Sequence, residues 1–230
     1  MTTRFLLKLV GGVFYATACF GVPLFLGAWT FDWPRAWIFL GVVFAFATIV
    51  MFALFPSRPD LLDERYKPPV QAGQPVADRV LVLLLLASFF GLLVFIALDV
   101  FQFRLLGGPT TPVAVLGLVL FVAGWSVLAL AVRDNDFTAL VVRHQEERHQ
   151  VVVERGTYSI VRHPMYAGGI PLFVGMALWL GSYAGVLATA VPIALLVARV
   201  GVEERFLRGN LAGYDAYTRR VRWRMLPFIW

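Results

Sequence analysis

Long apolar stretches alternate with short polar connections through most of the chain. Four of these stretches, over 9–29, 36–55, 80–98 and 112–132, hold about the ~20 residues that a helix needs to cross the ~30 Å hydrocarbon layer of a membrane. Two shorter runs, 167–180 and 183–198, are split by Gly181-Ser182-Tyr183 and predict a short helical hairpin. The pattern therefore predicts an all-α, polytopic transmembrane bundle of about six membrane segments, forming a single integral membrane domain over 1–230.

Composition agrees with this pattern and narrows the chemistry. Only 15% of the residues are charged, against roughly a quarter in soluble domains, so the chain lacks a water-facing surface. Cys19 is the only cysteine and lies inside the first apolar run, which excludes disulfide frameworks and cysteine-based metal sites. His144 and His149 lie beside Glu146 and Glu147, but this segment has no helical period, and we expect no metal site.

The basic residues indicate the orientation of the chain. All of the 20 Lys and Arg residues except Arg35 and Arg104 fall at the N-terminus, in the 56–79 and 133–165 loops, or from Arg199 onward. Basic loops stay in the cytoplasm, so both termini are expected there, in the cytoplasmic membrane if the protein is bacterial. This asymmetry requires the 167–198 hairpin to return to its starting side. A basic face beside membrane helices favours anionic lipids over nucleic acid, and no obligate protein partner is evident.

A first candidate site spans Gly156 to Gly168. Pro164 suits the first turn of a helix, which would place Arg162 and His163 at a helix start, where free N–H groups attract anions. Tyr166 follows about one turn later. This order is compatible with an anion-binding corner at the membrane surface, and equally with a basic flank followed by a helix cap.

A second candidate site is Arg199, Glu203 and Glu204, at the end of the last apolar run. Arg199 and Glu203 are four residues apart and share a helix face, so they could form a simple ion pair. Two adjacent carboxylates at a membrane exit favour a site with further cationic partners. The chain has no G-x-G-x-x-G after a strand and no P-loop, which excludes a Rossmann cofactor domain.

Together, these two segments resemble the isoprenylcysteine carboxyl methyltransferase family of integral membrane enzymes, in particular its bacterial branch. The resemblance is strong over 135–230 and weaker over 31–100. It rests on Gly156, Tyr158, Arg162-His163-Pro164, Tyr166 and Gly168, followed by Arg199, Glu203-Glu204, Leu207, Tyr214, Tyr217 and Pro227. Many members carry His where this chain has Gln150, with His149 one position away.

The resemblance implies S-adenosyl-L-methionine bound at the cytoplasmic face, with 133–230 carrying the cofactor and catalytic region. It implies cofactor contacts from Gln150, Val151, Val152, Val153, Tyr158, His163, Pro164, Met165, Tyr166 and Glu203, and catalytic roles for Arg199, Glu203 and Glu204. The implied reaction methylates a carboxylate of an isoprenoid- or lipid-linked acceptor, which is already ionised at pH 7 and needs no general base.

Two other readings remain open at this point. Steroid-reductase-like membrane enzymes share a similar C-terminal layout and would use NADPH, but they usually carry Asn where this chain has Met165. A non-enzymatic membrane protein that retains a decayed cofactor corner is the third. The joint presence of His163, Tyr166, Arg199 and both glutamates favours the methyltransferase.

Overall fold

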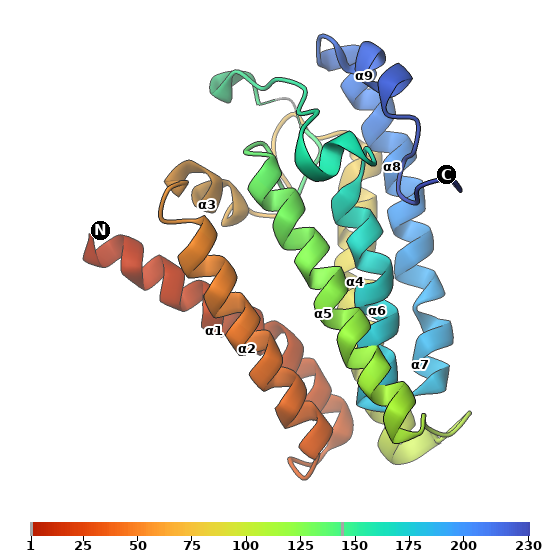
Figure 1. The fold of residues 1–230 in the computed structure, drawn as a ribbon. Helices are drawn as coiled ribbons and strands as arrows, with labels where there is room; N and C mark the ends of the chain where they lie inside the picture. Colours follow the sequence, from red (N-terminus) through yellow and green to blue (C-terminus); the bar gives the residue numbers. More distant parts are fainter. Residues whose placement is uncertain (1, 144) are drawn as a thin grey trace. The chain divides into compact units, whose positions relative to one another are not determined.

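The computed structural model describes residues 2–143 and 145–230, and these form helices and loops without a β-strand. The long helices are α1 (Thr3–Ala28), α2 (Pro34–Leu54), α4 (Val76–Leu98), α5 (Thr111–Asp134), α6 (Pro164–Leu180) and α8 (Ala190–Asn210) (Figure 1). Short helices are α3 (Pro59–Arg65), α7 (Tyr183–Ala188) and α9 (Tyr214–Arg220). A π-helical turn, Asp99–Phe103, extends α4, and 3-10 turns lie at Glu146–Arg148 and Gly156–Ser159.

Among the described residues, five helical segments are long and apolar enough to cross a membrane, which confirms the polytopic helical fold. They are Thr3–Ala28, Pro34–Leu54, Val76–Phe103, Thr111–Asp134 and Tyr183–Asn210, while the apolar helix Pro164–Leu180 is shorter. The last segment runs well beyond the apolar run at 183–198. It continues because Arg199 and Glu204 find partners inside the protein, so these charges do not end the helix.

The chain separates into two compact units. The first contains Met1–Pro59, Ala87–Val122 and Pro171–Val191. Its core includes Phe20, whose ring meets those of Phe39 and Phe89 edge to face at 5.5 and 5.2 Å. At Gly117 a Cβ atom would lie 2.9 Å from the carbonyl oxygen of Gly175, so α5 and α6 approach closely there because both residues are glycine.

The second unit contains Asp60–Leu86, Ala123–Ile170 and Pro192–Trp230. Here too α5 and α6 are close, since a Cβ on Gly168 would lie 2.7 Å from the carbonyl oxygen of Gly124. Helix α6 begins at Pro164, as the missing N–H of proline favours. A small core of Leu211, Tyr214, Tyr217 and Val221 joins α9 to the end of α8.

Candidate functional site

The second unit contains a cavity with about 1010 Å³ of empty space, including its open mouth. Three stretches of chain line it: the loop after α5, the segment that leads into α6, and the helices α8 and α9. The lining includes all ten expected cofactor contacts and two of the three expected catalytic residues, Glu203 (expected in both roles) and Arg199. The ten are Gln150, Val151, Val152, Val153, Tyr158, His163, Pro164, Met165, Tyr166 and Glu203.

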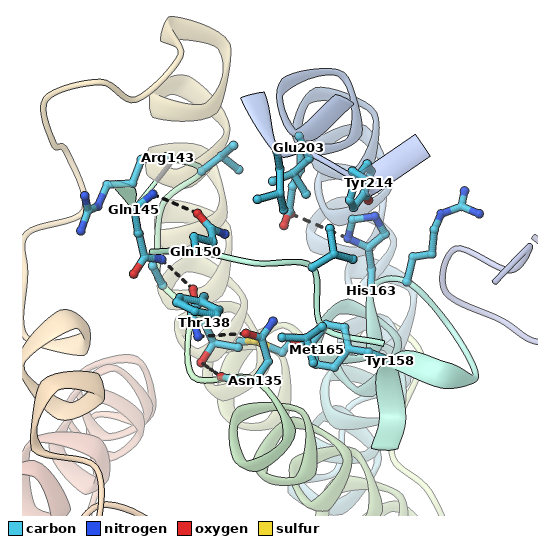
Figure 2. A pocket seen from close by; sticks show the side chains of 18 of the residues that line it. Asn135, Thr138, Arg143, Gln145, Gln150, Tyr158, His163, Met165, Glu203 and Tyr214 are labelled. Carbon is cyan, nitrogen blue, oxygen red and sulfur yellow. Dashed lines mark hydrogen bonds and ion pairs between the residues drawn. The ribbon is translucent and has the colours of Figure 1, made fainter. Parts of the chain in front are cut away.

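Glu203 lies at the centre of a polar group on one wall. The hydroxyl of Tyr166 donates a hydrogen bond of 2.5 Å to its Oε2, and Nδ1 of His163 lies 3.8 Å from the same oxygen. The imidazole of His163 stacks on the ring of Tyr166 at 5.5 Å, with only 4° between the planes. Figure 2 shows Glu203 and His163 facing each other, with Gln150 on the opposite side of the pocket.

Arg199 does not pair with Glu203 as their spacing suggested. Its Nε donates to Oδ1 of Asp78 at 2.8 Å, and its Nη2 donates to the carbonyl oxygen of Leu140 at 2.5 Å. The guanidinium also lies over the ring of Tyr166, 5.7 Å from its centre. Arg199 is therefore held by α4 and by the loop after α5, while Glu203 is held by α6.

Glu204, expected among the catalytic residues, is absent from the cavity lining and is only 4% exposed. Its Oε1 accepts a hydrogen bond of 2.7 Å from Nε of Arg162 and lies 3.4 Å from Nε2 of His163. Its Oε2 accepts from Arg224 at 3.2 Å. A side chain enclosed by three cationic or imidazole groups cannot reach a ligand, so Glu204 supports the wall behind His163.

Arg162 also belongs to this supporting layer. Besides Glu204, its guanidinium donates to the carbonyl oxygens of Val221 and Arg222, both at 2.8 Å. The backbone N–H groups of Arg162 and His163 donate to the carbonyl oxygens of Trp223 and Arg224. These N–H groups and this arginine thus bind the C-terminal tail at the start of α6, where the sequence left an anion-binding corner and a basic flank with a helix cap as equal alternatives.

The loop after α5 forms the opposite wall. The side-chain oxygen of Gln150 accepts from the backbone N–H of Gln145 at 2.9 Å, and this bond closes the turn that carries His149. His149 is exposed and outside the lining, so of the two alternative polar contacts Gln150 is the one placed at the cavity. Residues 151–154 form neither helix nor strand.

The same loop is anchored to α3. Nη2 of Arg143 lies 3.0 Å from both carboxylate oxygens of Glu64, and Lys67 binds the same carboxylate. Burial alone would raise the pKa of Glu64, but the hydrogen bonds from Lys67 and Arg143 outweigh it and lower that pKa. Glu64 is 4% exposed, so this carboxylate is part of the folded core and not of a solvated connector.

Tyr158 stands at the floor of the cavity. Its carbonyl oxygen accepts a hydrogen bond of 2.7 Å from the hydroxyl of Tyr217, which links the loop to α9. Burial raises the pKa of the Tyr158 phenol, which therefore stays neutral and keeps its proton for hydrogen bonding. Just before it, the backbone N–H of Thr157 donates to Asp134 at 2.8 Å and ties the segment to the end of α5.

Metal ligands do not gather anywhere in the described part of the chain, where no group of three His, Cys, Asp or Glu residues could hold an ion. His144 lies outside the described residues. Titratable groups in the cavity lining include the carboxylate of Glu203, the imidazole of His163, and guanidinium and phenol groups.

Known proteins match the part of the chain that builds this cavity. A family model described as phospholipid methyltransferase matches residues 112–212. A probable protein-S-isoprenylcysteine O-methyltransferase of Oryza sativa subsp. japonica is 32% identical over 121 residues, which are 51% of this chain and 62% of the rice protein. Protein-S-isoprenylcysteine O-methyltransferase B of Arabidopsis thaliana is 33% identical over 103 residues, 44% of this chain and 51% of that protein.

Over this part, the chain is similar to protein-S-isoprenylcysteine O-methyltransferases. The match spans between about half and three fifths of the length of these relatives. Both sequence segments that carry the resemblance, from Gly156 to Gly168 and from Arg199 to Leu207, fall inside residues 112–212, the range that the family model matches. The family match thus covers the two segments that the structure brings together around one cavity.

Two parts of the site lie outside the family match and were not foreseen. Asp78 holds Arg199 from the start of α4, and residues 221–224 bind Arg162 and His163 from the tail. Asp78 had a detectable signal, because a carboxylate directly before a long apolar run needs a partner if it enters the protein. The tail contacts are made largely through backbone carbonyl groups, which carry no sequence signal.

Proposed function

We propose that the protein is an integral membrane methyltransferase that uses S-adenosyl-L-methionine and methylates a carboxylate of an isoprenoid- or lipid-linked acceptor. The observation that carries this proposal is the shared cavity, to which the family segments contribute His163, Tyr166, Arg199 and Glu203. The named relatives are isoprenylcysteine O-methyltransferases, which supports the first of the three readings of the sequence over a reductase or a non-enzymatic protein.

The polar and apolar groups of the cavity lining match the polar and apolar parts of S-adenosyl-L-methionine. Glu203 is the cavity carboxylate with room for a ligand, because its side chain is 25% exposed, and it can accept hydrogen bonds from ribose hydroxyls or an ammonium group. Val151 to Val153, Leu207 and Leu211 provide apolar surface for a flat base. Tyr158 and Tyr166 add aromatic faces. When bound, this cofactor supplies an electrophilic methyl group.

The protein's own residues then have to place the acceptor. Arg199 can take an acceptor carboxylate through two parallel N–H donors, the geometry that arginine offers and lysine does not. No proton has to be removed, because a carboxylate is ionised at pH 7. Alignment of the attacking oxygen is then the main contribution of the site. Tyr166 touches both Arg199 and Glu203 and sets the spacing between the acceptor and cofactor sides.

Calorimetric titration of the detergent-solubilised protein tests the cofactor directly. We expect S-adenosylmethionine and S-adenosylhomocysteine to bind and to raise the melting temperature, since a ligand of the folded state stabilises it by mass action. His163→Ala and Glu203→Ala should weaken or abolish both effects. Binding of NADPH alone would contradict the proposal and support the reductase.

A further inference from the structure

Asp78 is a fully buried carboxylate next to the cavity but outside its lining. It lies in the first turn of α4 and is 0% exposed. Its Oδ2 accepts hydrogen bonds from Nε2 of Gln74 at 2.7 Å and from the backbone N–H of Val142 at 2.8 Å, and its Oδ1 accepts from Nε of Arg199 at 2.8 Å. All three donors are N–H groups, so both carboxylate oxygens of Asp78 act as acceptors.

These contacts determine which edge of Arg199 is left for a ligand. An arginine has five N–H donors, of which Nε binds Asp78 and Nη2 binds the carbonyl oxygen of Leu140. Among the described residues, none accepts a hydrogen bond from Nη1. The edge of the guanidinium that includes Nε is therefore occupied. At the opposite end, the N–H groups of Nη1 and the second N–H of Nη2 can still donate to a ligand.

We infer that Asp78 is a positioning residue that aims this free end of Arg199 into the cavity, where it takes the acceptor carboxylate end-on. The inference rests on the proposed function and deepens it. Without Asp78, Arg199 would keep only the hydrogen bond from Nη2 to the carbonyl oxygen of Leu140 and the ring contact with Tyr166 at 5.7 Å, so its long side chain would be less firmly oriented. Asp78 touches neither cofactor nor acceptor and acts through Arg199.

Asp78 also couples Arg199 to the loop that forms the opposite wall. The N–H of Val142 binds Asp78, and the carbonyl oxygen of Leu140 binds Arg199, so the ion pair and the 140–142 backbone form one hydrogen-bonded group. A change at Asp78 should loosen this stretch of the wall as well as Arg199. This gives the inference a measurable consequence that does not depend on catalysis.

Asp78→Asn tests the inference, because it keeps the size of the side chain and removes its charge. For methyl transfer to an S-farnesylcysteine with a free carboxylate, we expect kcat to fall about 10-fold or more, as for a lost charge-assisted hydrogen bond. Affinity for S-adenosylhomocysteine, measured by calorimetry, should stay within about 3-fold. Amide hydrogen exchange over 140–143 should become faster.

Asp99→Asn is the matched control. Asp99 follows the same helix, is 1% exposed, and also accepts two hydrogen bonds, from Ser182 at 2.6 Å and from the N–H of Leu105 at 2.9 Å. It belongs to the first unit and not to the cavity lining. Its substitution should lower the melting temperature, while the transfer rate of the folded protein and its cofactor affinity stay at their wild-type values.

A second pair of variants separates positioning from general destabilisation. Asp78→Glu keeps the charge, and its transfer rate should lie between those of wild type and Asp78→Asn. In an Arg199→Lys background, Asp78→Asn should lower the transfer rate little further, because the effects of two residues that act through each other do not add. The inference is overturned if the two losses add fully, if Asp78→Asn transfers like wild type, or if it loses cofactor affinity to the same degree as transfer. Wild-type protein that transfers no methyl group would overturn the proposed function itself.

Discussion

Glu203 and Glu204 are neighbours in sequence and have opposite surroundings. The side chain of Glu203 is 25% exposed and that of Glu204 only 5%. Glu204 is surrounded by Arg162, His163 and Arg224, whereas Glu203 accepts one hydrogen bond from Tyr166 and keeps its remaining lone pairs toward the cavity. Of the two glutamates, Glu203 is therefore the one that can bind a cationic or hydroxyl-bearing ligand in the cavity.

Substitution of Glu203 should therefore affect the cofactor most. For Glu203→Gln we expect affinity for S-adenosylhomocysteine to fall about 10-fold or more, because hydrogen bonds to a charged acceptor are about twice as strong as neutral ones. Tyr166→Phe removes one hydrogen bond that orients Glu203, and should cost about 1 kcal/mol, or roughly 5-fold. Calorimetric titration measures both changes.

Asp215→Asn serves as the control for these variants, since Asp215 forms an exposed ion pair with Arg208 outside the lining. Its cofactor affinity should equal that of wild type. If Glu203→Gln also binds like wild type, Glu203 is not a cofactor ligand.

The spacing of residues along the sequence predicts part of this arrangement. The four-residue spacing correctly places Arg199 and Glu203 on one side of α8, where both line the cavity. It could not predict their partners, because Arg199 pairs with a residue 121 positions away and Glu203 with one 37 positions away. Local periodicity contains no information about such pairs, and here they decide which carboxylate remains open.

Among the elements, the loop after α5 is the part of the cavity with the least regular structure. Hydrogen bonds hold it at separate points: Arg143 donates to Glu64 of α3, the N–H of Val142 donates to Asp78 of α4, and the N–H of Thr157 donates to Asp134 of α5. In the sequence, a charged run over 143–149 precedes Val151 to Val153 without a helical period. The loop also contacts α8, since the carbonyl oxygen of Leu140 accepts a hydrogen bond from Arg199, and contacts to so many separate helices are why its course could not be predicted.

The anchor between α3 and this loop should depend on pH. The pKa of Glu64 is lowered from its ordinary value of 4.5, so its ionised form stabilises the folded state above that value, and this stabilisation is lost as pH falls through the lowered pKa. At pH 7, Glu64→Gln should lower the free energy of unfolding by about 2 kcal/mol, since it removes the buried carboxylate that binds Arg143 and Lys67 and leaves Arg143 with the exposed Glu147 alone. Melting temperatures of both proteins, measured from pH 7 downward, should converge below pH 4.5. A difference that persists unchanged at low pH would contradict this role.

The junction between α5 and the α6 segment depends on Gly156. Its φ angle is +59°, and a Cβ atom there would collide with the carboxylate of Asp134. Gly156→Ala should therefore lower both the melting temperature and the affinity for S-adenosylhomocysteine. The loss in free energy of unfolding should exceed the about 1 kcal/mol that backbone strain alone costs. Gly73→Ala is the control, because Gly73 has a φ of +75° with nothing within 4 Å. Equal losses in the two variants would show that the contact with Asp134 is unimportant.

For the whole molecule, helix α6 decides the number of membrane crossings. Helix α6 has 17 residues, so at ~1.5 Å per residue it is about 25 Å long, slightly less than the ~30 Å hydrocarbon layer. If it crosses, there are six crossings and the two termini lie on the same side. The apolar pattern predicted the spans themselves well, because burial in lipid requires every long helix to be apolar over its length.

Reporter fusions test the crossings. Fusions after Tyr66 and at the C-terminus should both report the cytoplasm, since all but Arg35 and Arg104 of the 20 basic residues then lie inside. A fusion at Gly108 should report the opposite side. Disagreement between the Tyr66 and C-terminal fusions would mean that α6 does not cross.

The most direct test of the proposed function is methyl transfer itself. Purified protein in detergent or lipid is incubated with S-adenosylmethionine labelled in its methyl group and an S-farnesylcysteine with a free carboxylate. We expect label in the acceptor as a methyl ester, which mild base releases as methanol. For Arg199→Lys we expect a transfer rate about 10-fold or more lower at unchanged cofactor affinity, because lysine lacks the two-donor fork. Absence of transfer to this and to lipid-extract acceptors, or an Arg199→Lys variant as fast as wild type, would contradict the proposed function.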